Sequence, residues 1–279
     1  MTTVVLEDLV HTYAEGSVRA VDGVDLRIGS GERVALVGQN GSGKSTLARH
    51  LNGLLRPTDG RVLLDGVDAR TRTVAQLARA VAGCFQDPDR QIFAGSVGKE
   101  VAFGPRNLGM PADVQRAAVT EALDAVGLAA ETSTNPYDLG YSRRKLLTIA
   151  SVLAMRTPVV VLDEPTTGQD ARGMDRVATI VARLAADGRT VIAISHDMRF
   201  VAEHFERVIV MRAGKVVLDG PPVAVFGSAA WDTLASTYLE APYPARVGQR
   251  MSLGSTPTDV AVVAALGARV HPGRSRPDA

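Results

Sequence analysis

The sequence has little cysteine and almost no imbalance of charge. Its single cysteine, Cys84, excludes an internal disulfide and fits a reducing compartment. Lys and Arg number 31 against 30 Asp and Glu, so the net charge of +1 provides no broad positive field for nucleic acid or an anionic membrane. We therefore expect protein partners and no nucleic acid, and we interpret Cys84 as structural.

Long hydrophobic runs are also missing. The first ten residues carry Glu7 and Asp8 and lack the basic start and apolar run of a signal peptide. The longest apolar stretches, 159–162 and 260–266, are far shorter than the ~20 residues that span a bilayer. We expect a cytoplasmic protein that reaches the inner face of the cell membrane only through a partner.

What is present is a regular alternation of apolar segments in a chain that is 279 residues long and 46% hydrophobic. Short strand-like runs dominate the beginning, helical spacing dominates 74–153, and a strand, helix, strand order follows, which predicts a buried parallel sheet. The expected strands are 3–6, 24–28, 33–37, 159–162 and 190–194, two more around 59–60 and 65–66, and a hairpin of 208–211 with 215–218. The expected helices are 44–55, 112–126, 144–154, 172–186 and a short one capped by Thr256 before Pro257.

A glycine-rich loop between an apolar strand and a helix matches G-x-x-x-x-G-K-[ST], the pattern of a phosphate-binding P-loop. Its glycines allow successive backbone N–H groups to point at phosphate oxygens, and the start of the helix adds positive potential. Lys44 is expected to bridge the β- and γ-phosphates of ATP, and Ser45 to ligate Mg²⁺. The expected nucleotide-binding residues are Gly38, Gln39, Asn40, Gly41, Ser42, Gly43, Lys44, Ser45 and Thr46.

The apolar run 159–162 ends in two acids, Asp163 and Glu164, at the edge of a parallel sheet where ligands bind. Asp163 is predicted to hold Mg²⁺ and Glu164 to orient and partly deprotonate the attacking water. His196 ends the next strand and reaches the γ-phosphate only if that strand neighbours the Asp163 strand. A solvated strand end and a structural histidine are the alternatives for these residues.

In this order the motifs resemble an ATP-binding-cassette (ABC) nucleotide-binding domain from Val4 to about Val225. The resemblance implies that Tyr13 stacks on adenine and that Gln86 serves the catalytic and Mg²⁺ sites. It also implies that Asp170 lies in a loop at a dimer interface and that His196 is the switch histidine. Simple packing is the alternative for Tyr13, and an ordinary loop amide for Gln86.

The resemblance implies an α/β fold of the ABC P-loop NTPase type. We expect an amino-terminal antiparallel β region, a RecA-like core sheet and an inserted helical subdomain near 87–157. The nucleotide-binding domain is expected to span 1–225, followed by a small carboxyl-terminal extension, 226–279. Residues 271–279 are predicted to be disordered.

One motif departs from the family. Where ABC proteins usually carry Leu-Ser-Gly-Gly-Gln, this chain has a degenerate signature. In the family this loop contacts ATP held by the opposite subunit, so we favour a heterodimer with a second ABC ATPase subunit whose signature is intact. A homodimer that tolerates the variant is the rival. The degenerate signature is Leu139, Gly140, Tyr141, Ser142 and Arg143.

The segments 87–93 and 101–108 are similar to those of energy-coupling-factor (ECF) importers, which include cobalt and nickel uptake systems. The resemblance implies two further partners, a transmembrane coupling subunit and a substrate-binding membrane subunit, and leaves metal ions and vitamins open as the cargo. Three alternatives remain: the ATPase of another ABC transporter class, a non-transport ABC protein of translation or DNA repair, and a regulatory module that binds ATP without useful turnover.

Overall fold

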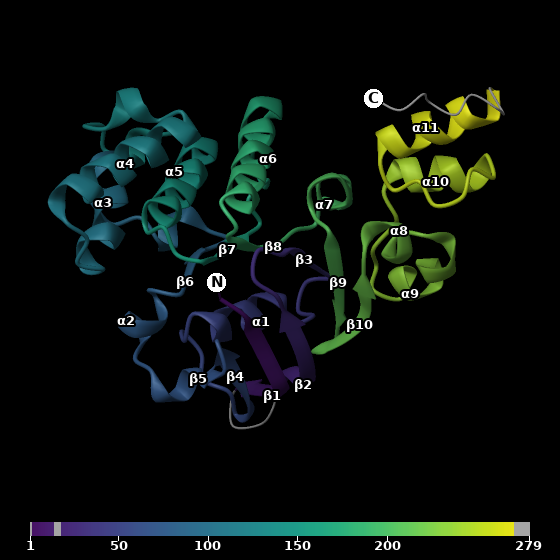
Figure 1. Cartoon of the computed structure of the whole chain (residues 1–279), viewed down its shortest axis with the longest axis horizontal. Helices are drawn as coiled ribbons and strands as arrows, with labels where there is room; N and C mark the ends of the chain where they lie inside the picture. The colour runs from purple at the N-terminus through teal and green to yellow at the C-terminus, as the bar shows by residue number, and fades with distance from the viewer. Residues whose placement is uncertain (1, 14–17, 271–279) are drawn as a thin grey trace.

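Two β-sheets form the framework of the protein (Figure 1). The computed structural model describes residues 2–13 and 18–270. The first sheet is antiparallel, with the strand order β2-β1-β4-β5. Its strands are β1 (Val4–Tyr13), β2 (Val18–Ile28), β4 (Asp59–Leu64) and β5 (Val67–Asp68).

The second sheet has the order β10-β9-β3-β8-β7-β6, in which only β10 runs antiparallel to its neighbour. Because its other strands are parallel, their carboxyl ends meet at one edge, and the loops that follow β3, β6, β7 and β8 converge there. The strands are β3 (Arg33–Val37), β6 (Val81–Cys84), β7 (Val159–Asp163), β8 (Thr190–Ile194), β9 (Arg207–Arg212) and β10 (Lys215–Gly220).

The parallel strands separate two hydrophobic clusters, and their side chains alternate between them as strand geometry requires. Val160 and Leu162 belong to the cluster that contacts the helices, whereas Val159 and Val161 belong to the cluster shared with the antiparallel sheet. Every residue of β7 and β8 is buried. This explains the continuous apolar runs 159–162 and 191–194 within these strands.

Three helices, α3 (Val97–Asn107), α4 (Ala112–Val126) and α5 (Tyr141–Ala154), pack on one another to one side of the parallel sheet, as the teal ribbons of Figure 1 show. Helix α6 (Ala171–Ala186) packs against β8 and α4. The remaining helices of this part are α1 (Lys44–Leu51), α2 (Val74–Leu77) and α7 (Met198–His204). None of the helices in the described ranges is both long and apolar enough to cross a bilayer.

The chain then continues into four short helices, drawn from green to yellow in Figure 1: α8 (Pro222–Val225), α9 (Trp231–Ala235), α10 (Tyr243–Arg250) and α11 (Asp259–Val270). The expected helix start at Thr256 is wrong. The Thr256 hydroxyl is buried and donates to the carbonyl of Pro244 at 3.1 Å, while Thr258 Oγ1 accepts from the Ala261 amide at 3.2 Å, as a helix cap does. The predicted disorder of 271–279 lies outside the described residues.

In the first half one predicted helix end was wrong, and one strand was missed inside a segment that is mostly helical as predicted. The helix predicted over 44–55 ends at Leu51, because Gly53 adopts φ of 74°, a left-handed conformation that stops a helix. The segment predicted to be mostly helical, 74–153, contains strand β6, which pairs with β7. The expected strand 33–37, strand 190–194 and helix 112–126 coincide with the observed elements.

Candidate active site

The loop between β3 and α1 is shaped by glycines that no other residue could replace without a shift. Gly38 and Gly43 have φ of 146° and 103°. A Cβ on Gly38 would lie 2.2 Å from the carbonyl oxygen of Met211, and one on Gly43 would lie 2.2 Å from that of Ala20. The loop therefore needs glycine both for its backbone angles and for its close approach to the neighbouring strands.

Lys44 begins α1 with its side chain folded into this loop. The ammonium is buried and donates to the carbonyl oxygens of Gly38 at 2.7 Å and Gln39 at 2.9 Å, with Ser42 Oγ at 3.4 Å. Burial lowers the pKa of Lys44, and the charges of Glu164 and Asp163 oppose that shift. A positive charge is thus held beside the glycine-rich backbone, where a phosphate group would meet both.

Asp163 and Glu164 leave the carboxyl end of β7 as a buried acidic pair. Glu164 has φ of 52°, and its amide donates to the Ile194 carbonyl at 2.9 Å, which fixes the turn. Desolvation by burial raises the pKa of both carboxyl groups, and the nearby Ser45 hydroxyl opposes this for Asp163. A left-handed backbone at a non-glycine acid is the kind of strain found at functional positions.

His196 follows β8, and β8 is the direct neighbour of β7, as its prediction required. Its Nε2 lies 3.1 Å from Glu164 Oε1, although this approach lacks the angles of a hydrogen bond. The Thr167 hydroxyl donates to Glu164 Oε2 at 3.2 Å. Burial raises the pKa of Glu164, and the His196 charge and the Thr167 hydrogen bond both oppose that rise. The pKa of this carboxyl group is therefore set by opposing effects, as is common at functional sites.

Gln86 belongs to the same edge because it follows β6, the strand beside β7. Ser45, Gln86 and Asp163, the three expected Mg²⁺ residues, line one cavity of about 490 Å³. Asp163 Oδ1 is buried and has no hydrogen-bond partner in the described part of the chain. Oxygen donors around a buried, unpaired carboxylate oxygen fit a hard cation such as Mg²⁺.

Tyr13 lies at the end of β1 and reaches the P-loop helix. Its hydroxyl is 3.3 Å from Thr46 Oγ1. The ring packs edge-on against His11 at 4.5 Å between centroids, and His11 packs in turn against His50 at 4.7 Å. The structure thus places Tyr13 beside Thr46, while its expected stacking on adenine stays a prediction.

The variant signature contacts the loop that follows Glu164 in the same chain. A Cβ on Gly168 would lie 2.7 Å from Tyr141 Cε1, so the ring rests directly on that glycine. Ser142 Oγ lies 2.8 Å from Gln169 Oε1, and Gln169 Nε2 donates to the Ser142 carbonyl at 3.1 Å. We define these four residues, Tyr141, Ser142, Gly168 and Gln169, as the signature clasp.

The other residues of this region have local partners. Arg143 is paired with Glu131, Leu139 is buried, and the Asp170 side chain accepts from the Gly173 amide at 2.8 Å as the cap of α6. Among the described residues, no hydrogen bond or ion pair joins 139–143 to the P-loop. The structure therefore brings Lys44, Asp163, Glu164 and His196 together at one edge of the parallel sheet. The signature residues 139–143 are not part of this group.

Sequence reasoning missed Lys145, in the second turn of α5. Its side chain is completely buried, and the ammonium donates to the carbonyl oxygens of Phe85 at 2.9 Å, Gln86 at 2.6 Å and Asp163 at 2.8 Å. It thus joins the signature helix to two loops of the site. The sequence did contain a signal that Lys145 is buried. It precedes Thr148 by three residues and Ile149 by four, so it lies on the same buried face of α5.

Comparison with known proteins agrees with this arrangement. Residues 21–167 match the ABC transporter family. An energy-coupling factor transporter ATP-binding protein, EcfA, of Methanothermobacter thermautotrophicus is 38% identical over 257 residues, which cover 91% of this chain and 82% of that protein. Among solved structures, cbiO1 from Clostridium perfringens, described as part of the ABC transporter complex cbiONQ, has a TM-score of 0.73 and 32% identity, over 89% of this chain and 98% of that one.

Other relatives are longer than this chain. A putative ABC transporter ATP-binding protein of Methanosarcina acetivorans is 43% identical over 244 residues, 88% of this chain. The matched part is only 39% of that relative, so this chain spans about two fifths of its length.

Proposed function

The chain belongs to the ABC transporter family of ATP-binding proteins, and from that membership we propose that it is the ATP-hydrolysing subunit of an ECF-type importer. The match over 21–167 and the full-length similarity to an EcfA protein support this proposal. The observation that carries it is the meeting of Lys44, Asp163, Glu164 and His196 at one sheet edge.

In this proposal the P-loop binds the triphosphate of ATP. The backbone N–H groups of 38–46 and the Lys44 ammonium contact the phosphates, and Tyr13 stacks on adenine. Ser45, Gln86 and Asp163 hold Mg²⁺, which neutralises charge on the β- and γ-phosphates.

Glu164 is the proposed general base for the attacking water. Its buried carboxyl group has a raised pKa, which makes it a stronger base than an exposed glutamate. His196, 3.1 Å from Glu164 Oε1, is placed to hold that side chain in position and to contact the γ-phosphate. Glu164 accepts a proton from water as the water oxygen attacks phosphorus, and ADP leaves.

The proposed assembly is a heterodimer with a second ABC ATPase subunit. Tyr141 places a ring where the usual signature has glycine, and the ring rests on Gly168 of its own chain. Ser142 is likewise hydrogen-bonded to Gln169 of its own chain. These contacts support a weak interaction between this chain's signature and the ATP bound by the partner. The partner's intact signature completes the other nucleotide site, which contains Lys44.

The proposed surface for the transmembrane coupling subunit follows Gln86. Three aromatic side chains, Phe93, Phe103 and Tyr137, are 60%, 37% and 55% exposed, and we call them the aromatic patch. Phe93 and Phe103 pack edge-on at 4.7 Å between centroids. The buried Glu100 carboxylate accepts from the Phe93 amide at 3.1 Å and so holds the loop. Exposed aromatic groups on a fixed loop favour a protein partner.

This assembly places the chain at the cytoplasmic face of the membrane. The nucleotide-binding domain is proposed to span 1–225, with the helical subdomain near 87–157, and 226–279 forms the extension. The cargo, a metal ion or a vitamin, is chosen by a separate substrate-binding membrane subunit.

Affinity purification of the full chain from detergent-solubilised membranes tests this function. We expect a second ABC ATPase with an intact signature and a multispanning membrane protein to copurify, and this complex to hydrolyse ATP faster than the chain alone. The double variant Phe93→Ala/Phe103→Ala should lose the membrane protein but keep nucleotide binding. Vigorous, cooperative hydrolysis by a homodimer without a membrane protein would contradict the proposal.

A further inference from the structure

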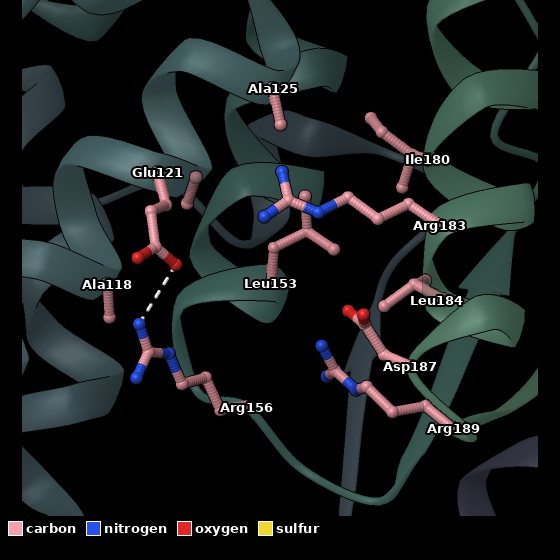
Figure 2. Close-up of a pocket in the computed structure, with 11 residues that line it drawn as sticks. Ala118, Glu121, Ala125, Leu153, Arg156, Ile180, Arg183, Leu184, Asp187 and Arg189 are labelled. Carbon is pink, nitrogen blue, oxygen red and sulfur yellow. Dashed lines mark hydrogen bonds and ion pairs between the residues drawn. The ribbon is translucent and has the colours of Figure 1, made fainter.

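A second cavity, of about 360 Å³, is lined by residues of α4, α5 and α6 (Figure 2). Two of its lining residues, Arg156 and Arg189, stand before the amino ends of β7 and β8. Asp163 is the last residue of β7, and His196 follows the carboxyl end of β8, so both lie at the opposite ends of these strands. The cavity is therefore separate from the proposed nucleotide site.

Small side chains on α4 create this hollow. Ala118, Ala122 and Ala125 recur at spacings of four and three, so they lie on one face of α4 toward α5 and α6. Longer apolar side chains complete the wall from the other two helices. These are Leu153 on α5 and Ile180 and Leu184 on α6.

Charged groups surround this apolar wall, with three arginines against two acids. Arg156 is paired with Glu121 at 2.9 Å, and Asp187 lies close enough to interact with the Arg189 charge. Arg183 forms no ion pair within the described ranges. One positive charge is left in excess among the residues that line the cavity.

Arg189 is only partly satisfied. Its Nε donates to the Thr157 carbonyl at 2.7 Å, but its Nη2 is buried and has no hydrogen-bond partner in the described chain. Burial lowers its pKa to about 10, and the nearby charge of Arg156 acts in the same direction. Figure 2 shows the side chains of Arg183 and Arg189 extending toward the middle of the pocket.

We propose that this cavity binds a small organic monoanion, an apolar body that carries one carboxylate. The apolar wall accommodates the body, and the exposed Arg183 guanidinium binds the carboxylate through charge-assisted hydrogen bonds, with the positive charge of Arg189 beside it. A volume of about 360 Å³ suits a molecule of this size. Glu121 and Asp187 disfavour a polyanion such as a nucleotide triphosphate.

Titration calorimetry of the full chain with 2-naphthoate tests this site. Arg183→Gln should weaken binding by at least about tenfold, because a charge-assisted hydrogen bond is lost. Ala125→Leu should weaken it by filling the cavity. Arg116→Gln, an exposed arginine elsewhere on α4, should bind like the wild type, and the neutral naphthalene-2-carboxamide should bind more weakly than 2-naphthoate.

Three results would overturn the proposal. The first is equal binding by the wild type, Arg183→Gln and Ala125→Leu, each with an unchanged melting temperature. The second is displacement of 2-naphthoate by a magnesium complex of a non-hydrolysable ATP analogue, which would place the probe in the nucleotide site. The third is no binding by the wild type at millimolar probe.

Discussion

Two adjacent acids, Asp163 and Glu164, have different surroundings although they are neighbours in the sequence. Both are buried at the end of β7, but Asp163 lines the cavity with Ser45 and Gln86, whereas Glu164 turns at φ of 52° toward His196 and Thr167. The acidic strand end could be predicted from sequence. The turn that separates the two environments could not, because it depends on the Ile194 carbonyl of the neighbouring strand.

Replacing the proposed base tests this division of roles. In Glu164→Gln, we expect ATP turnover to fall by about 10²- to 10⁴-fold, since an amide cannot accept the proton from water. Nucleotide binding should stay within a few fold of the wild type. Steady-state phosphate release and calorimetry measure the two quantities, and wild-type hydrolysis by Glu164→Gln would refute the assignment.

His50 is a second residue whose environment has a measurable consequence. It is buried on α1, its Nδ1 lies 2.7 Å from the Thr46 carbonyl, and its Nε2 lies 3.1 Å from His11 Nδ1. Desolvation by burial lowers its pKa to about 4, and the Thr46 bond only partly opposes this. The folded protein therefore holds His50 neutral where the unfolded chain would protonate it.

This difference predicts a stability that falls with acid. Between an ordinary histidine pKa of about 6.5 and the folded value, the unfolded state binds one proton more than the native state, so stability decreases as the pH falls. From about pH 7 to about pH 5 the wild type should lose about 2 kcal/mol more of unfolding free energy than His50→Gln. Urea denaturation at both pH values measures this, and parallel losses in the two proteins would contradict it.

At the scale of elements, local patterns located β3, β8 and α4, because each is a continuous or periodic apolar segment. Strand β6 was missed since it has only four residues and depends on pairing with β7, far along the chain. The contacts of Lys145 were missed for the same reason, as Phe85 precedes it by 60 positions. Pairing between distant segments is what single-sequence patterns do not contain.

Lys145 makes α5 a structural link between the two site loops. Lys145→Met would leave three carbonyl oxygens without their donor, and we expect a destabilisation of about 2–4 kcal/mol together with a loss of ATPase activity. Lys99→Met, the same change at an exposed helical lysine, should stay within about 0.5 kcal/mol of the wild type. Urea unfolding compares them, and equal stability of the two variants would exclude the link.

At the scale of the whole molecule, the two sheets and the α3–α5 helices bring the P-loop, the acidic strand end, His196 and Gln86 to one edge, while the signature clasp stays apart from them. The sequence motifs predicted which residues gather. They did not predict that the signature would be bound to its own Gly168 and Gln169, because those contacts join residues about 27 positions apart. In our proposal this chain is one of the two ATPase subunits of a heterodimer. That proposal depends on ATP binding.

Calorimetric titration with a non-hydrolysable ATP analogue and Mg²⁺ tests that step most directly. We expect the wild type to bind, and Lys44→Ala, at unchanged melting temperature, to bind at least about thirtyfold more weakly, because the buried ammonium that contacts the phosphates is gone. No binding by the wild type, or equal affinity in both proteins, would contradict the account.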